Sequence, residues 1–262
     1  MLKLKGVAFD LEGTLIDVEK AHWVGHIFCA YDCGVDLLYL GENVKSQFEN
    51  QAFADCVHAG LLSNLDKICK LIPHFIGGGK PGVVEEIYEL SDKKKSIEEA
   101  NILDNFYYKL ILQNMEIMPR HGVIEAIEWF LKNGFDISIG SLTVTEEAMF
   151  LLKKSGIIKK FKPDRIILRE DVRNLKPAPD VYLKTAEKMG VRPCEQIVFE
   201  DSPNGARAAK VAGSIAIGMP AYNLIAAQLP LLQAGADRIF IDWREINFKN
   251  LIFNLEQELN CK

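Results

Sequence analysis

Short apolar runs separated by helical patterns constrain the fold of this chain more than any other feature of its sequence. The runs have the length of buried strands, and strands that alternate with helices are typical of a parallel sheet covered by helices on both faces. We therefore predict an α/β fold built on a doubly wound parallel sheet. The expected strands are Val7–Leu11, Ile137–Leu142, Arg165–Leu168, Ile197–Glu200 and Ile215–Gly218.

The first two expected strands are separated by about 120 residues, far more than an ordinary connection within a sheet. This segment carries helical patterns at His22–Cys33 and Phe48–Cys69, and a capping box at Ser96–Glu99 opens a helix toward Gln113. We expect an inserted helical domain at residues 17–117 and a core domain formed by residues 1–16 and 118–262.

Local capping signals place two helices of the core. Thr145 is the expected N-cap of one helix, which should end near Ser155–Gly156. Ser202 with Pro203 is typical of the start of another helix, and Gly213 of its end.

Composition excludes several classes of protein. The chain has 262 residues with 48% hydrophobic content, enough for a substantial core. The net charge of -5 and the scattered basic residues argue against nucleic acid and favour a small-molecule partner. The six cysteines show no Cys-x-x-Cys spacing, which favours reduced thiols. We expect no signal peptide, because Asp10 and Glu12 interrupt the N-terminal apolar residues. We expect a cytoplasmic protein that is a monomer or a small homo-oligomer.

One uncharged stretch, bounded by Lys210 and Asp237, is long enough to cross a bilayer. Gly218, Pro220 and Pro230 interrupt it, which favours a strand, a loop and a short helix. We therefore expect no membrane segment.

Polar side chains follow three of the expected strands. Asp10 ends the first run, the hydroxyl residues Ser141 and Thr143 follow the second, and Glu200 and Asp201 end the fourth. A buried carboxylate is costly unless a cation or hydrogen bonds neutralise it. The carboxyl ends of parallel strands meet at one edge, where open α/β sheets bind their ligands. Carboxylates gathered there would repel one another unless they shared a hard cation such as Mg²⁺.

Four segments in this order resemble the motifs of the haloacid-dehalogenase-like superfamily, whose members are mostly Mg-dependent phosphatases and phosphomutases. They contain Asp10, Thr143, Lys176 before a proline-punctuated helix start, and the acidic pair in Phe199–Gly205. The last segment is closest to the branch of β-phosphoglucomutase and the small-metabolite phosphatases. The resemblance covers residues 1–17 and about 118–220. It implies a Rossmann-like core with an inserted helical cap of the C1 type.

The resemblance also implies roles for the matching acids. Asp10 would be the nucleophile, which forms an aspartyl-phosphate and splits the reaction into two steps. Mg²⁺ would be held by Asp10, the backbone carbonyl of Glu12, Asp201 and Glu200. Glu200 could instead accept a hydrogen bond behind the metal ligands.

Four residues would contact the phosphate. Thr143 would donate a hydrogen bond to a phosphoryl oxygen, and Lys176 would supply positive charge near the phosphate and Asp10. Gly13 permits a tight turn after the first strand, and Thr14 with neighbouring backbone amides can line the phosphate pocket.

The hydroxyl position has alternatives. Ser141 or Thr145 could take the place of Thr143, which could instead be only a residue that precedes a helix.

Glu12 departs from the family pattern, which has aspartate as the general acid and base. Glutamate keeps the chemistry but adds a methylene, and a displacement of about 1 Å in a catalytic group can lower the rate about 100-fold. The enolase-phosphatases of methionine salvage also read Asp-x-Glu-Gly-Thr. We expect Glu12 to protonate the leaving group and then to activate water.

Two features of the inserted segment leave alternatives open. Residues 77–80 could wrap a phosphate, which makes Lys80 a candidate for substrate binding, or they could be a plain connection. Four further side chains share one helical face, which is either a soft-metal site or a buried packing face. They are His22, His26, Cys29 and Cys33.

These patterns predict a Mg²⁺-dependent phosphatase of a small phosphorylated metabolite. A phosphomutase of the β-phosphoglucomutase type would use the same residues and differ in whether a second substrate hydroxyl or water attacks the phosphoenzyme. A non-catalytic protein that binds a phosphometabolite is another alternative, and it would bind ligand without releasing phosphate.

Overall fold

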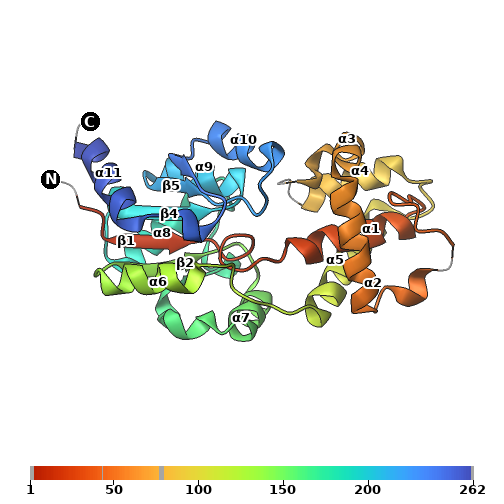
Figure 1. Ribbon diagram of the computed structural model, residues 1–262, viewed down its shortest axis with the longest axis horizontal. Coiled ribbons are helices and arrows are strands. Elements are labelled where there is room, and N and C mark those ends of the chain that lie inside the picture. Colours follow the sequence, from red (N-terminus) through yellow and green to blue (C-terminus); the bar gives the residue numbers. More distant parts are fainter. Residues whose placement is uncertain (1–2, 43, 77–79, 261–262) are drawn as a thin grey trace. The chain divides into compact units, whose positions relative to one another are not determined.

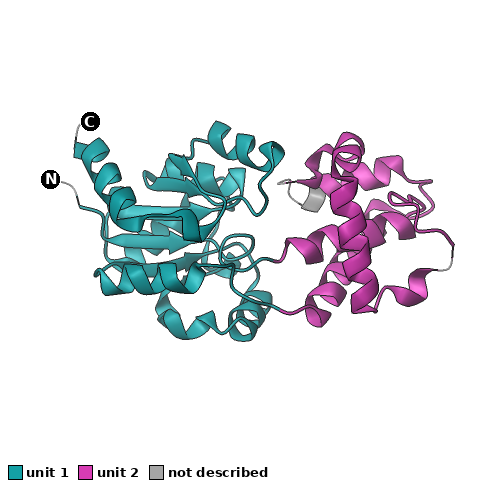
Figure 2. Cartoon of the chain, viewed as in Figure 1, with its two compact units in different colours: residues 1–17, 117–262 teal, residues 18–116 magenta. Residues whose placement is uncertain are grey.

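The computed structural model describes residues 3–42, 44–76 and 80–260 of the chain. The chain divides into two compact units (Figure 2). Unit 1 consists of residues 1–17 and 117–262, and unit 2 of residues 18–116. The chain therefore leaves unit 1 once and returns to it once.

Within the described part of unit 1, the strands form a six-stranded sheet in the order β3-β2-β1-β4-β5-β6. Figure 1 labels β2, β1, β4 and β5 of this sheet. All neighbouring strands are parallel. The strand order reverses between β1 and β4, as in doubly wound nucleotide-binding folds. The predicted α/β, Rossmann-like parallel sheet is confirmed, and β6 is an addition that the sequence did not indicate. The strands are β1 (Gly6–Phe9), β2 (Asp136–Gly140), β3 (Ile166–Ile167), β4 (Gln196–Glu200), β5 (Ile215–Gly218) and β6 (Arg238–Ile239).

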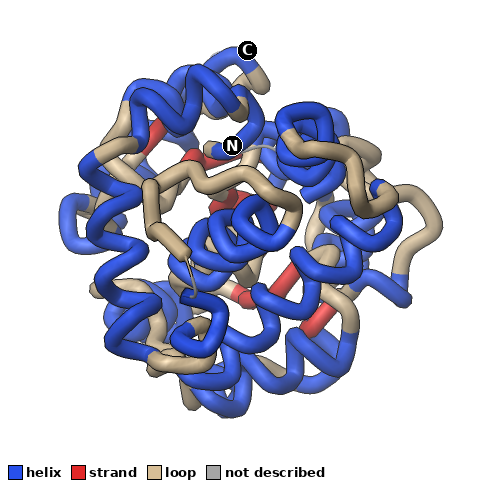
Figure 3. Tube along the Cα trace, turned by 90° about the vertical axis from the view of Figure 1, so that its right-hand side faces the viewer, coloured by secondary structure: helices blue, strands red, loops and turns tan. Residues whose placement is uncertain are grey.

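Helices pack on both faces of this sheet. They make up more of the trace than the strands do (Figure 3). Ala8 of β1 points to the face where α8 and α9 pack, and its neighbours there include Val198 and Tyr182. The next residue, Phe9, points to the opposite face, where its ring lies 6.2 Å from the ring of Phe130 in α6. The helices of unit 1 are α6 (Val123–Lys132), α7 (Thr145–Lys154), α8 (Asp180–Met189), α9 (Pro203–Ala212), α10 (Ile225–Gln233) and α11 (Phe248–Asn260).

The capping predictions for the core have different outcomes. Ser202 caps α9 by accepting a hydrogen bond from the Gly205 N–H, and Gly213 ends the helix in a left-handed conformation, as predicted. The prediction that Thr145 is an N-cap is wrong, because Thr145 is the first residue of α7 and Val144 precedes it. The hydroxyl of Thr145 instead donates to the distant Glu170 carboxylate at 2.7 Å.

Unit 2 is helical. Ser96 and Glu99 form the predicted capping box at the start of α5. Helices α1 and α5 pack closely, and a side chain at Gly25 of α1 would come within 3.0 Å of the Tyr108 backbone nitrogen. Between them, buried His26 Nδ1 lies 2.5 Å from Asp104 Oδ1. The helices are α1 (Glu19–Asp32), α2 (Gln51–Ser63), α3 (Leu65–Leu71), α4 (Lys80–Leu90) and α5 (Ile97–Asn114).

The uncharged stretch between Lys210 and Asp237 contains β5, a loop and the short helix α10, as its glycines and prolines indicate. None of the helices in the described ranges combines the length and the apolar character that a membrane crossing requires.

Candidate active site

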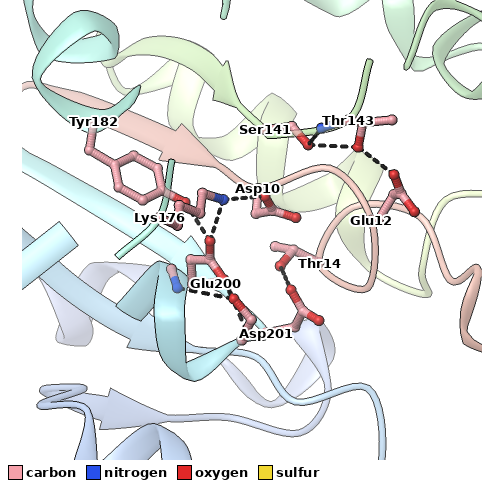
Figure 4. A network of polar contacts seen from close by, with 11 residues as sticks. Asp10, Glu12, Thr14, Ser141, Thr143, Lys176, Tyr182, Glu200 and Asp201 are labelled. Carbon is pink, nitrogen blue, oxygen red and sulfur yellow. Dashed lines mark hydrogen bonds and ion pairs between the residues drawn. The ribbon is translucent and has the colours of Figure 1, made fainter. Parts of the chain in front are cut away.

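The carboxyl ends of three adjacent strands bring the candidate residues together (Figure 4). Phe9 pairs with Ile139 of β2 on one side and with Phe199 of β4 on the other. The next residue, Asp10, donates its backbone N–H to the Phe199 carbonyl at 3.0 Å. Register between strands therefore sets the position of Asp10 beside Glu200.

Lys176 links two carboxylates at this edge. Its Nζ lies 2.5 Å from Asp10 Oδ1 and 2.5 Å from Glu200 Oε1. All three side chains are buried, and that of Glu200 is 0% exposed. In this low-dielectric setting one ammonium group partly neutralises two acids.

Burial shifts the proton affinities of this network. Burial raises the pKa of Asp10 to about 7, although the neighbouring Lys176 acts to lower it. Burial acts to lower the pKa of Lys176, but Asp10 and Glu200 outweigh it and raise that pKa above its usual range. Burial and the Glu200 charge raise the pKa of Tyr182, so its hydroxyl stays a hydrogen-bond donor.

Glu200 is held from both of its oxygens. Oε1 accepts hydrogen bonds from Lys176 and from the Tyr182 hydroxyl at 2.7 Å, and Oε2 accepts from the backbone N–H and hydroxyl of Ser202 at 3.0 and 2.9 Å. A Cβ at Gly205 would lie 1.6 Å from Glu200 Oε1, so only glycine fits there. These contacts favour the alternative in which Glu200 anchors Lys176 rather than binding a metal directly.

Asp201 lies against the turn that follows β1. Its Oδ1 accepts a hydrogen bond from the Thr14 hydroxyl at 3.2 Å. Gly13 has a φ of 74°, and a Cβ there would come within 2.2 Å of Asp201 Oδ2. The turn therefore requires glycine both for its left-handed backbone and for the space that the carboxylate fills.

The hydroxyl residues after β2 meet Glu12. The Thr143 hydroxyl donates to the Glu12 carboxylate, and the Ser141 and Thr143 hydroxyl oxygens lie 2.9 Å apart. Ser141 is buried at the strand end, whereas Thr145 is bound to Glu170. Ser141 and Thr143 thus both stay candidates for the phosphate contact, and the position of Thr145 does not favour it.

The residues fit a magnesium ion, although the carboxylates are spread out. Within residues 3–42, 44–76 and 80–260, no group of three or more His, Cys, Asp or Glu side chains gathers tightly enough to hold a metal. Mg²⁺ needs fewer, because it usually takes one or two carboxylates and completes its shell with water and substrate phosphate. Asp10, Asp201 and the Glu12 carbonyl offer oxygen donors of the kind that Mg²⁺ takes.

The candidates in unit 2 have separate outcomes. Residues 77–79 lie outside the described residues, and Lys80 is described only as the first backbone position of α4. His26 is bound to Asp104, Cys29 Sγ donates to the Ala100 carbonyl at 3.4 Å, and the His22 ring stacks on Tyr108. These contacts are those of a packing face between α1 and α5.

Two contributors to the site were missed. Tyr182 lies at the third position of α8, where its apolar neighbours indicate only a core residue. Arg120 follows the return of the chain to unit 1 and binds the backbone of the turn at Gly13, at 2.6 Å from its carbonyl. No local pattern distinguishes Arg120 from an ordinary surface arginine, because its partners are distant in sequence.

The fold and the site define a class of α/β protein in which a carboxylate, a shared lysine and an acidic pair lie at the carboxyl edge of a parallel sheet. The chain belongs to the haloacid dehalogenase-like hydrolase family, whose model matches residues 4–213. The resemblance drawn from the motifs is thereby confirmed.

Several relatives and solved structures are similar along most of the chain. The fructose-1-phosphate phosphatase YqaB of Escherichia coli is 26% identical over 218 residues, which cover 81% of this chain and 94% of that protein. A phosphorylated carbohydrates phosphatase of Thermotoga maritima is 25% identical over 237 residues, or 89% of this chain and 92% of that protein. The crystal structure of a conserved haloacid dehalogenase-like protein from Agrobacterium tumefaciens has a TM-score of 0.70 at 21% identity and covers 97% of this chain and 99% of its own.

Proposed function

We propose that the chain is a Mg²⁺-dependent phosphatase that hydrolyses small phosphorylated metabolites, with sugar phosphates as the first class to test. Membership of the hydrolase family and the similarity to two phosphatases of phosphorylated sugars support the reaction class. We place the enzyme in the cytoplasm, because the spacing of its six cysteines favours reduced thiols.

The observation that carries this proposal is the environment of Asp10. A buried carboxylate ends the central strand and lies 2.5 Å from a buried lysine. The lysine aligns one carboxylate oxygen, and its charge is close enough to attract the equatorial oxygens of a phosphoryl group.

In the first step, a carboxylate oxygen of Asp10 attacks phosphorus in line with the ester bond. The new bond gives an aspartyl-phosphate, and the bond from phosphorus to the ester oxygen breaks. Glu12, in its protonated form, gives its proton to the departing oxygen. Lys176, Thr14 and a hydroxyl of the Ser141–Thr143 pair hold the phosphoryl oxygens.

In the second step, Glu12 takes a proton from a water molecule, whose oxygen attacks the phosphorus of the aspartyl-phosphate. The bond to Asp10 breaks, and inorganic phosphate leaves with the carboxylate restored. The Thr143 hydroxyl, which donates to Glu12 in the structure, keeps the longer glutamate side chain directed to the site.

A magnesium ion bound by Asp10, Asp201 and the Glu12 carbonyl would offset the negative charge of the acids and of the phosphoryl group. We assign Glu200 to the anchoring of Lys176 on the basis of its four hydrogen bonds. We assign unit 2 as the cap domain, because it is a separate compact unit inserted between β1 and β2.

Phosphate release tests the proposal. The purified protein is assayed with and without Mg²⁺ on sugar phosphates including fructose 1-phosphate, on nucleotides and on small phosphoacids. We expect turnover of at least one sugar phosphate that requires Mg²⁺. Asp10→Asn should lower kcat by about 10⁴-fold or more while the protein stays folded.

Three other outcomes would contradict parts of the proposal. Retained turnover in Asp10→Asn would show that Asp10 is not the nucleophile. Turnover that depends strictly on a bisphosphorylated activator indicates a mutase. Binding of phosphorylated ligands by a folded protein that releases no phosphate indicates a binding protein.

A further inference from the structure

Arg120 joins three loops at the carboxyl edge of the sheet. Its guanidinium donates hydrogen bonds to the carbonyl oxygens of Gly13 at 2.6 Å, Met219 at 2.7 Å, Pro220 at 3.0 Å and Ile241 at 3.0 Å. These carbonyls belong to the segments that follow β1, β5 and β6. The two terminal nitrogens carry four N–H groups in a planar fork, which matches four acceptors held in fixed positions.

Two further hydrogen bonds, from Arg120 and Trp243, hold carbonyl oxygens of the turn after β1. The Arg120 backbone N–H donates to the Leu15 carbonyl at 2.9 Å, and Trp243 Nε1 donates to the Thr14 carbonyl at 3.2 Å. With the bond from the Arg120 side chain to Gly13, three successive carbonyls have donors from distant parts of the chain. The orientation of three successive peptide planes is therefore fixed.

A planar trans peptide places its N–H on the side opposite its carbonyl. Because Arg120 binds the Gly13 carbonyl, the N–H of Thr14 points away from Arg120. The Thr14 side chain, on the same residue, donates to Asp201, one of the acids of the site. The hydrogen bond to Gly13 thus sets the direction of an amide beside the acidic pair.

We infer that Arg120 is a positioning residue that orients the Gly13–Thr14 peptide for phosphate binding. This inference rests on the proposed function, because it assigns the N–H of Thr14 to the phosphate. Arg120 acts through the turn and does not touch the phosphate itself. Its own position follows from the antiparallel pairing of Ile16 with Pro119, which places residue 120 beside the turn.

A lysine cannot replace this arginine fully. Its ammonium is a compact charge on a flexible stem, whereas the guanidinium reaches four carbonyls at once in one plane. A methionine would leave the carbonyls without these donors. We therefore expect Arg120→Met to have a larger effect than Arg120→Lys, in the same direction.

The experiment compares Arg120→Met and Arg120→Lys with a matched control, Arg165→Met. Arg165 precedes β3 at the amino end of the strands, and its Nη2 lies 3.5 Å from Asp136 Oδ1. The control also removes a half-buried guanidinium but leaves the turn intact. Thermal unfolding, kcat and KM, and the Kd for inorganic phosphate in the presence of Mg²⁺ are measured for each protein.

We expect Arg120→Met to weaken phosphate binding and to lower kcat/KM by about tenfold or more. Arg120→Lys should fall between Arg120→Met and wild type. Arg165→Met should keep the phosphate Kd of wild type, because its guanidinium contacts Asp136 and not the turn after β1. Amide hydrogen exchange at Thr14 should be faster in Arg120→Met and unchanged in the control.

If Arg120→Met does not fold, the Kd and exchange of Arg120→Lys decide the question. A Kd for phosphate in the folded Arg120 variants that equals that of wild type overturns the inference. So does an equal loss of affinity in Arg165→Met at a matched loss of stability. A wild-type protein that neither binds nor releases phosphate overturns the proposed function first, and this inference with it.

Discussion

Each unit buries a carboxylate beside a basic side chain, but the two arrangements differ in how many acids contact the basic group. In unit 2, the His26 imidazole faces the Asp104 carboxylate at 2.5 Å, and together they join α1 to α5. In unit 1, Asp10 and Glu200 share the Lys176 ammonium, each at 2.5 Å. One acid and one imidazole join two helices, whereas two acids share one lysine at the sheet edge, where a cation or a polar ligand can offset the second carboxylate.

The topology of the two units accounts for this difference. Parallel strands end at one edge, so their last residues converge even when they are far apart in the sequence. Helices that pack side by side bring single side chains into contact along their length. The contrast predicts that changes in the sheet network reduce activity, whereas changes in the helical pair reduce stability.

The largest effect is expected for Lys176→Met, which leaves Asp10 and Glu200 buried without their ammonium. We expect the free energy of unfolding to fall by about 3–5 kcal/mol, because both partners lose their countercharge, and phosphate release to be lost. Urea denaturation and the release assay measure the two effects. Lys188→Met, at an exposed position of α8, is the control, and an equal loss in both variants would contradict the comparison.

A large effect on activity is also expected for Gly205→Ala. The new methyl group would lie 1.6 Å from Glu200 Oε1 and must displace that carboxylate from Lys176 and Tyr182. A shift of about 1 Å in such a group lowers kcat/KM by about 100-fold. Steady-state kinetics measure it, and wild-type kinetics in this variant would show that the position of Glu200 is unimportant.

A smaller effect, and of the other kind, is expected for Asp104→Asn. The change keeps the shape of the side chain but weakens its hydrogen bond to buried His26, which we expect to cost about 1–3 kcal/mol of unfolding free energy. Activity at low temperature should stay close to that of wild type. If Asp104→Asn lost activity without losing stability, the prediction that changes in the helical pair affect stability and not activity would be wrong.

The smallest effect is expected for Gly60→Ala in α2 of unit 2. A Cβ there meets nothing within 4 Å, and alanine is the better helix former. We expect a gain of about 0.5–1 kcal/mol in unfolding free energy, measured by urea denaturation, with unchanged kinetics. A loss of stability would show that the open space at this glycine does not decide the outcome.

The sequence was informative about the sheet where strands are fully buried. The runs that became β1, β2, β4 and β5 are apolar because helices cover both faces, and their ends carry Asp10, Glu200 and Asp201. In contrast, Arg238 and Ile239 of β6 are half-exposed, and two residues are too few for a pattern. Pairing with β5, rather than the residue composition of β6, determines that this edge segment is a strand.

Partnerships between distant residues set the limit of the sequence-based prediction. The sequence places Thr145 as a cap by local rules, but Glu170 binds its backbone N–H and hydroxyl in the folded protein. The sequence likewise offers Glu200 as a metal ligand, whereas Lys176 and Tyr182, which lie far from it in the sequence, bind one of its oxygens in the folded protein. Residue types and order identify the acids, but packing decides which oxygens stay available.

The pairing of Ile16 with Pro119 has an evolutionary consequence. The chain leaves the sheet unit and re-enters it at neighbouring points, so the span between them can be closed by a short loop at little entropic cost. Proteins that evolve from such a chain can exchange, enlarge or delete unit 2 without a change in the strand order of the sheet. Diversification can then proceed in the insertion while the machinery at the sheet edge is inherited intact.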